Sequence, residues 1–169
     1  MKRITQSLGL FLFCMTAWNV TAQKTNADVT ITQIFETSAD KVWSELRQLD
    51  NIDVLSSIIA KVEFNGPKGV GGSRVCTSAD GQGRFKETII EFDDIGRSYT
   101  YAVVEGVPAM GMVNQFKVVD LGYEKSMVVW TSSYEKFVTN PQMDETQFKG
   151  FLTQASGEMI ANVGKRAMK

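Results

Sequence analysis

The sequence contains no histidine, and this absence excludes several classes of chemistry. Ser-His-Asp and Cys-His nucleophilic sites need an imidazole base, and histidine is also the commonest metal ligand. Carboxylates alone can bind a metal ion, but no clustered Asp/Glu motif occurs in the chain. We therefore expect no metal site and no cofactor.

Cysteine is also scarce, because Cys14 and Cys76 are the only two in 169 residues. Cys14 lies in an N-terminal segment that we expect to be removed, which leaves Cys76 alone and excludes an internal disulfide. An exported protein with a single cysteine usually buries the thiol as a small hydrophobic group. The fold must then be held by its core alone.

Positive charge is limited as well. Removing residues 1–22 takes away two basic side chains, Lys2 and Arg3, and leaves 16 basic against 19 acidic side chains, a net charge of −3. No basic run stands out, so nucleic acid is not an expected partner. The glycine-rich segment 66–72 lacks the Gly-Lys-Ser/Thr ending of a phosphate-binding loop, and we interpret it as a hairpin connection.

Residues 1–22 have the features of a secretory signal peptide. Lys2 and Arg3 precede the apolar segment Leu8–Val20, and the small residue Ala22 offers a cleavage site. The apolar segment is too short for an ordinary membrane span, although an uncleaved anchor is the alternative. We expect residues 23–169 to form one secreted or periplasmic domain, a monomer or weak dimer without a stable membrane span.

One long helix is predicted near the C-terminus, from Met143 to Met168. Asp144 and Glu145 place negative charge in its first turn, and Lys165 and Arg166 place positive charge in its last turn, as the helix dipole favours. The apolar residues expected on one face are Phe148, Phe151, Leu152, Ala155, Met159 and Val163.

Three glycines, Gly150, Gly157 and Gly164, repeat every seven residues on what we expect to be the opposite face of this helix. They are interpreted as tolerated on a solvent face. The alternatives are close approach of another chain and a helix loose enough to lift for ligand uptake. Alanine at all three positions is expected to stabilise the fold.

The remaining chain predicts one strand, two short helices and then six consecutive strands. The first strand covers residues 28–36. The first helix follows the candidate N-caps Thr37–Asp40, and the second helix begins near Ile52. The later strands are expected at residues 61–65, 73–79, 84–93, 98–105, 112–121 and 125–137. This order is an α+β arrangement in which about seven antiparallel strands curve around the long helix.

At this point the chain resembles the helix-grip (SRPBCC) superfamily. That group includes START-like domains, Bet v 1-like pathogenesis-related plant proteins, plant abscisic acid receptors and the polyketide cyclase/dehydrase family. The segments that carry the resemblance are Phe35–Trp43, Gly69–Arg74, Phe85–Ile89, Asp93–Asp94, Ser98–Gly106 and Val129–Thr131. It covers roughly Val29 to Met168, and it implies a helix-grip fold with a cavity for a hydrophobic ligand between sheet and helix.

Alternation along the strands, together with the resemblance, predicts which side chains line that cavity. In the receptors the glutamate of the segment matching Phe85–Ile89 points inward, which implies the same for Glu87. On the last strand Trp130 is preferred to the opposite set of Val129, Thr131 and Ser133, because the largest side chain gains most from burial. The predicted ligand-binding residues are Arg74, Cys76, Glu87, Tyr101, Val103, Met112, Asn114, Phe116, Trp130 and Phe151.

One possibility is a partner-binding domain whose cavity is largely filled by the side chains of Phe85, Phe116, Trp130 and Phe151. Two functions that need an open cavity also stay open. One is an exported protein that encloses a lipid-like or aromatic ligand under the last helix and the Pro108 loop. The alternative is a cyclase, dehydratase or lyase in which Glu87 is acid or base, while Tyr101 and Arg74 polarise a carbonyl. Arg74 and Glu87 are expected on neighbouring strands, either orienting a ligand or forming a structural ion pair. The catalytic candidates are thus Glu87 and Tyr101.

Overall fold

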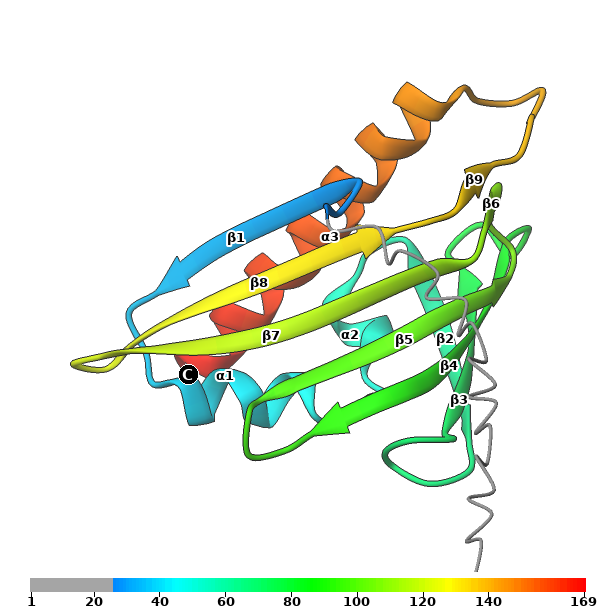
Figure 1. The fold of residues 1–169 in the computed structure, drawn as a ribbon. Helices are drawn as coiled ribbons and strands as arrows, with labels where there is room; N and C mark the ends of the chain where they lie inside the picture. The colour runs from blue at the N-terminus through cyan, green and yellow to red at the C-terminus, as the bar shows by residue number, and fades with distance from the viewer. Residues whose placement is uncertain (1–25) are drawn as a thin grey trace, which may run out of the picture.

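The computed structural model describes residues 26–169, so the expected signal peptide lies outside the described residues. The chain forms a curved antiparallel sheet with three helices on its concave side (Figure 1). In chain order the elements are β1 (Val29–Phe35), α1 (Ala39–Leu46), α2 (Ile52–Leu55), β2 (Ile59–Asn65), β3 (Ser73–Ser78), β4 (Arg84–Asp93), β5 (Ser98–Glu105), β6 (Ala109–Met110), β7 (Met112–Gly122), β8 (Lys125–Ser133), β9 (Lys136–Phe137) and α3 (Glu145–Ala167).

The main sheet has seven strands in the order β1-β8-β7-β5-β4-β3-β2. Its sequence-distant pair is β1 with β8, which brings the two ends of the domain together. Helix α3 crosses the sheet, and α1 and α2 lie beside it (Figure 1). The expected helix-grip fold is confirmed.

A second, two-stranded sheet was not expected from the sequence. The segment 125–137, predicted as one strand, is divided into β8 and β9, and β9 pairs with β6. The chain changes partner at Glu135, whose amide donates to the Met110 carbonyl at 2.9 Å. Gly111 permits the sharp turn between β6 and β7 because its φ is +62°.

Alternation along the strands holds where the ladders are regular. On β8, Ser126, Val128, Trp130 and Ser132 are buried, which confirms the inward choice of Trp130. On β4 the register shifts between Ile89 and Glu91, so Ile90 forms a bulge. This bulge reverses the parity, and Phe92 rather than Glu91 packs against the core.

Helix α3 begins next to the acidic residues Asp144 and Glu145, as the charge pattern predicted. Asp144 is the N-cap and accepts a hydrogen bond from the Gln147 amide, while the Gln147 side chain accepts one from the Asp144 amide. The buried face is rotated from the predicted one, because Phe151 is 37% exposed. The buried positions are Phe148, Leu152, Ser156, Ile160, Val163, Gly164 and Ala167.

Only two of the three helical glycines face open space. A β-carbon at Gly150 or Gly157 would have nothing within 4 Å, whereas one at Gly164 would lie 2.0 Å from Cε1 of Phe35. The prediction that all three share a solvent face is therefore wrong for Gly164. Here the helix packs so closely on β1 that only a hydrogen atom fits.

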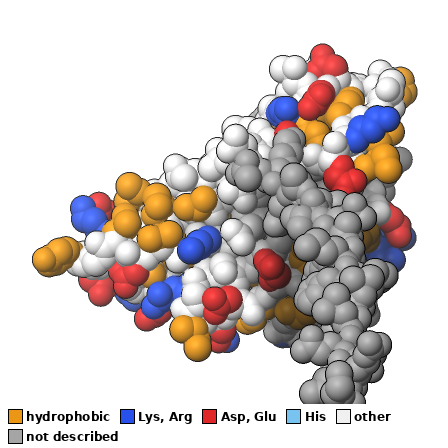
Figure 2. Space-filling model, viewed as in Figure 1, with side chains coloured by type: hydrophobic (Ala, Val, Ile, Leu, Met, Phe, Trp, Pro, Cys, Tyr) orange, Lys and Arg blue, Asp and Glu red, His pale blue; other side chains and the backbone are white. Residues whose placement is uncertain are grey.

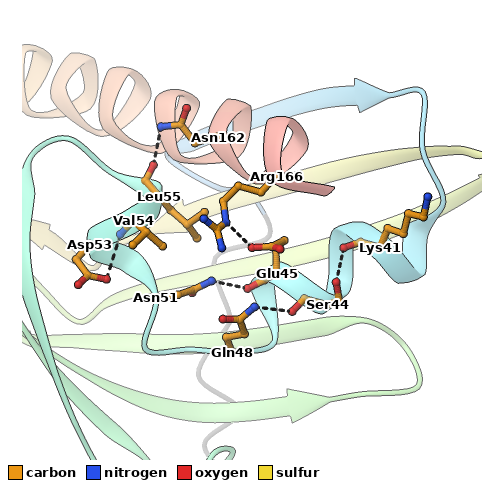
Figure 3. A network of polar contacts seen from close by, with 10 residues as sticks. All are labelled: Lys41, Ser44, Glu45, Gln48, Asn51, Asp53, Val54, Leu55, Asn162 and Arg166. Carbon is orange, nitrogen blue, oxygen red and sulfur yellow. Dashed lines mark hydrogen bonds and ion pairs between the residues drawn. The ribbon is translucent and has the colours of Figure 1, made fainter. Parts of the chain in front are cut away.

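Polar contacts join the C-terminal half of α3 to the two short helices (Figure 3). The Asn162 side-chain amide donates to the Leu55 carbonyl at 2.9 Å, and Arg166 Nε donates to Glu45 Oε2 at 2.6 Å. On the other side of Glu45, its carbonyl accepts a hydrogen bond of 2.8 Å from the Asn51 side chain. These contacts tie α1, α2 and α3 into one unit.

The β7–β8 hairpin turns through Tyr123 and Glu124, two residues with left-handed backbone conformation. Their φ values are 53° and 55°, a conformation that Asn and Gly adopt at lower cost. Replacing the pair by Asn-Gly is expected to raise the free energy of unfolding by about 1 kcal/mol, because the strain in the turn is relieved. Urea denaturation followed by tryptophan fluorescence measures this change.

A paired alanine variant, Tyr123→Ala with Glu124→Ala, is the control, because it keeps both β-carbons and with them the strain. Tyr123 is 99% exposed, so loss of its ring removes little packing. Figure 2 shows apolar side chains gathered at this end of the sheet, where the exposed members include Ile34, Leu121 and Tyr123. An equal gain in the alanine pair would contradict the strain explanation.

Candidate functional site

A cavity of about 90 Å³ lies between the concave face of the sheet and α3. The strands contribute side chains from the centre of the sheet, and α3 covers them from above. Most of the lining side chains are apolar. From α3 they are Phe151, Leu152, Ala155, Ser156 and Met159.

Eight of the ten predicted ligand-binding residues line this cavity. They are Cys76, Glu87, Tyr101, Val103, Met112, Asn114, Trp130 and Phe151. Seven of these side chains come together because β3, β4, β5, β7 and β8 are neighbours in the sheet and alternate residues share a face, while Phe151 comes from α3.

The other two predicted residues, Arg74 and Phe116, are buried behind the cavity lining. Phe116 is fully buried, with its ring centroid 5.4 Å from that of Tyr99 and 6.4 Å from that of Trp130. Arg74 is 1% exposed and does not line the cavity, but it contacts Glu87 and Tyr101, which do. Neither side chain is placed to touch a molecule in the cavity.

Several lining residues were missed by the prediction. Phe85 shares the face of Glu87 by alternation along the strand, but it was not among the predicted ligand contacts. The segment around α2 contributes a whole side of the cavity, and strand parity could not reveal this because the segment lies outside the central strands. The missed residues are Ile52, Ser56, Ile58, Ile59, Phe85, Val107, Leu152, Ala155, Ser156 and Met159.

Glu87 is the only charged residue that lines the cavity in the described part of the chain. Its register partner on β3 is Arg74, whose Nε donates to Oε2 of Glu87. Nη1 of Arg74 donates to the Leu49 carbonyl at 2.7 Å. Burial, the largest single effect, would lower the pKa of Arg74, but Glu87 together with Tyr99, Tyr101 and Cys76 outweighs it, and the pKa is raised well above its usual value.

The guanidinium of Arg74 also packs on aromatic rings. Its central carbon is 4.8 Å from the ring centroid of Tyr101 and 5.9 Å from that of Tyr99. Such cation–π contacts are strongest where the cation is shielded from water. The Arg74 side chain is thus fixed on several sides, and it fixes Glu87 in turn.

Tyr101 places its hydroxyl in the buried part of the site. The indole Nε1 of Trp130 donates to this hydroxyl at 3.3 Å. Burial, and after it the nearby Glu87 carboxylate, raise the pKa of Tyr101 well above its usual value. The hydroxyl therefore keeps its proton at physiological pH and can donate it in a hydrogen bond.

Asn114 is a buried polar residue in the lining and is only 2% exposed. Its register partners are Tyr101 on β5 and Ser132 on β8. Within residues 26–169 its side-chain oxygen Oδ1 has no hydrogen-bond partner. An unpaired buried oxygen is costly, because it has lost water without gaining a donor.

Cys76 is the one cysteine in the described residues, and it is buried as expected. Burial, followed by the Glu87 carboxylate, raises the pKa of its thiol to about 12. With Cys14 replaced by serine, a disulfide reagent at pH 8 is expected to react with the native protein at least roughly a hundredfold more slowly than with the urea-unfolded chain, since the thiolate is the reactive form.

Adding Ser57→Cys to the same Cys14→Ser background provides the control, because position 57 is exposed and the new thiol should react rapidly in the folded protein. The reaction is followed by absorbance of the released thiol. Rapid modification of Cys76 itself in native protein would contradict the buried, neutral thiol.

The rim of the cavity is closed between α3 and the segment after α2. Phe151 lines the cavity and is 37% exposed, so it stands at the border with solvent. The amide and hydroxyl of Ser57 donate to the two carboxylate oxygens of Glu158, both at 3.0 Å. Ser56 and Met159, the neighbours of these two residues, line the cavity.

Two further features of residues 26–169 limit what the domain can do. No group of three or more acidic or cysteine side chains is placed to hold a metal ion in this part of the chain. Within the same residues, no helix combines the length and the hydropathy that crossing a membrane requires.

Comparison with solved structures shows the same fold in proteins of low sequence identity. XoxI from Bacillus cereus is 15% identical with a TM-score of 0.72, covering 83% of this chain and 95% of that one. An aromatase/cyclase from a Streptomyces species is 18% identical with a TM-score of 0.71, covering 83% and 92%. Norcoclaurine synthase from Thalictrum flavum, in complex with dopamine and hydroxybenzaldehyde, is 19% identical with a TM-score of 0.68, covering 83% and 85%.

A search among curated proteins gave no significant match. The sequence profile of one family, described as polyketide cyclase / dehydrase and lipid transport, matches residues 26–169. This range includes every strand and helix of the domain and all residues of the cavity lining. The chain therefore belongs to the polyketide cyclase / dehydrase and lipid transport family.

Proposed function

We propose that the protein is exported and encloses a small hydrophobic molecule in the cavity under α3. The observation that carries this proposal is the cavity itself, an apolar space in which Glu87 is the only charged lining residue among those described. A packed core normally has few voids larger than a water molecule. An empty space in the centre of the domain lacks packing contacts that a bound ligand would supply.

The size of the cavity limits the ligand. Its volume of about 90 Å³ is smaller than the roughly 150 Å³ of an engineered protein cavity that binds benzene. A single aromatic ring or a short branched chain therefore needs modest widening, and a multi-ring ligand needs displacement of α3 or of the α2 segment. Because Phe151 is exposed, its side chain can move to widen the cavity with little loss of packing.

Native mass spectrometry of the purified protein tests this function. We expect a co-purified small compound, or uptake of single-ring aromatics by protein that is isolated empty. The variant Ala155→Phe serves as the control, since it adds a ring to a position that lines the cavity and should abolish uptake. Empty protein that takes up no aromatic compound and no short fatty acid would contradict the proposal.

Export is tested separately at the N-terminus. The mature protein recovered from the medium or the periplasm should begin at or near Gln23, because the signal peptide is expected to end at Ala22. N-terminal sequencing or intact mass measures this. Retention of Met1 in the exported fraction would support the uncleaved anchor instead.

A cyclase, dehydratase or lyase activity is the second candidate, and one observation favours it. Glu87 and Tyr101 both line the cavity, so a carboxylate and a protonated hydroxyl face the same space. Glu87 could remove or return a proton while the Tyr101 hydroxyl donates to a carbonyl oxygen. Arg74 would then be a positioning residue that holds Glu87, and not a group that touches the substrate.

Glu87→Gln separates the two candidates. An enzyme should lose turnover by roughly a hundredfold or more while the dissociation constant of its substrate changes little. A binding protein should keep both its ligand and its fold. If the substitution unfolds the protein, which thermal denaturation would show, the role of Glu87 is confined to its ion pair with Arg74.

A further inference from the structure

From the polar atoms of the cavity lining we infer that the ligand is an uncharged molecule with a hydroxyl group, which donates a hydrogen bond to Oδ1 of Asn114. This inference rests on the proposed binding function and names the chemical class that the site selects. It also makes Asn114 the residue that determines specificity.

The first step is the state of Asn114 itself. The side chain is 2% exposed and lines the cavity, and its Oδ1 has no hydrogen-bond partner within residues 26–169. An amide oxygen can only accept a hydrogen bond. Oδ1 itself is buried in the empty domain, so the lining must widen beside it before a ligand hydroxyl can supply the missing donor. An ether or a hydrocarbon leaves the oxygen unpaired.

The second acceptor in the lining is Glu87. Its Oε2 accepts from Arg74, while its other oxygen, Oε1, makes no hydrogen bond within the described part of the chain. The side chain of Glu87 is 14% exposed and lines the cavity. The polar side of the cavity thus presents two acceptor oxygens beside the Tyr101 hydroxyl. A ligand hydroxyl, which both donates and accepts, matches this side better than a group that only accepts.

The third step concerns charge. No Lys or Arg lines the cavity in the described residues, and Arg74 is only 1% exposed and already paired with Glu87. A ligand carboxylate would enter an apolar space without a cationic partner and next to the Glu87 carboxylate, which is strongly unfavourable. A ligand ammonium would add a second positive charge beside a pair that is already neutral.

These steps favour the structural ion pair over the other role that the sequence left open for Arg74. In that other role the guanidinium would hold a carboxylate or a carbonyl of the ligand. Because the guanidinium lies behind the lining, the site instead disfavours carboxylates and accepts alcohols or phenols.

Four single-ring probes test the inference by calorimetric titration of the unaltered protein: phenol, toluene, benzoate and benzylammonium. We expect phenol to bind and the two ions to bind at least roughly tenfold more weakly, since a charge buried without a partner loses its hydration. Binding of either ion as tightly as phenol overturns the inference, even if the proposed function holds. Failure of all four probes to bind also overturns the inference, whereas the proposed function fails only if short fatty acids are not taken up either.

Asn114→Leu gives the specific test, because it removes the acceptor and keeps a similar volume. The ratio of the toluene to the phenol dissociation constant should fall by roughly tenfold relative to unaltered protein, the value of one hydrogen bond to a buried partner. Val113→Leu is the control on the same strand but outside the cavity lining, and it should leave that ratio unchanged. A ratio that changes less than about twofold in a folded Asn114→Leu protein overturns the inference.

Should Asn114→Leu fail to fold, the ranking of the four probes in the unaltered protein still decides, because it needs no variant. Near-ultraviolet circular dichroism and thermal denaturation establish the folded state of each variant before titration.

Discussion

Replacing Arg74 with methionine is expected to lower the free energy of unfolding by about 3–5 kcal/mol, the usual effect of removing one partner of a buried ion pair. The carboxylate of Glu87 would lose its cation, and the carbonyl of Leu49 would lose its 2.7 Å hydrogen bond. Leu49 is fully buried with φ of 66°, so its backbone depends on such support. Urea denaturation followed by tryptophan fluorescence measures the loss.

The double variant Arg74→Met with Glu87→Leu is the informative comparison. It removes both charges, so no ion is left unpaired in the core, and much of the lost stability should return. Arg74→Lys keeps the charge but not the planar group that reaches both Glu87 and Leu49, and an intermediate loss is expected. A single Arg74→Met variant within about 1 kcal/mol of the unaltered protein would contradict the structural role of the pair.

Gly164→Ala is expected to destabilise the protein by about 1–3 kcal/mol, even though alanine is the better helix former. Its β-carbon would lie 2.0 Å from Cε1 and 2.3 Å from Cδ1 of Phe35, a ring that is 6% exposed and fixed in the core. Either α3 or β1 must shift to make room. The change is measured by thermal and urea denaturation.

The other two glycines provide the matched controls. Gly150→Ala and Gly157→Ala meet no atom within 4 Å, so each should raise the free energy of unfolding by about 0.5–1 kcal/mol through the helix propensity alone. Phe35→Leu should partly rescue Gly164→Ala by removing the clashing ring atoms. Equal effects of alanine at all three positions would show that helix propensity, and not packing on β1, governs this face.

Much of the cavity lining could be predicted because a strand has only two faces. Once Glu87 was placed inward, the regular β3–β4 ladder fixed Cys76 on the same face. The regular stretch of the β4–β5 ladder from Glu87 to Ile89 did the same for Tyr101 and Val103. The choice of Trp130 on β8 followed from the gain on burying the largest side chain. These predictions needed only local alternation and one reference residue.

The direction of a long side chain could not be predicted in the same way. Arg74 starts on the inner face of β3, yet its guanidinium reaches the Leu49 carbonyl between α1 and α2. That carbonyl is available because Leu49 has a positive φ, which no apolar pattern in the sequence announces. The contribution of α2 to the cavity was missed for a related reason, since helix orientation depends on packing between distant segments.

The rotated face of α3 has a similar explanation. The sequence shows three glycines at seven-residue spacing and a stripe of large apolar residues. However, the inner face of a helix that lies over a cavity includes positions that border the cavity and positions that pack directly on the sheet. Phe151 and Met159 border the cavity, while Ile160 and Val163 are fully buried. Gly164 belongs to the second group because β1 approaches the helix there.

Helix α3 is held in place near both of its ends. Near its start the Tyr134 hydroxyl donates to Glu145 at 2.7 Å, and near its end Gly164 is pressed onto β1. The part of α3 that covers the cavity lies between these two contacts, and it contains Gly150 and Gly157, the two glycines with free space around them. A helix held in this way bends in its middle more easily than it detaches, because it accommodates gentle curvature by lengthening the hydrogen bonds on one side. The curvature of α3 should therefore grow with the size of the enclosed molecule, while its two ends stay in place.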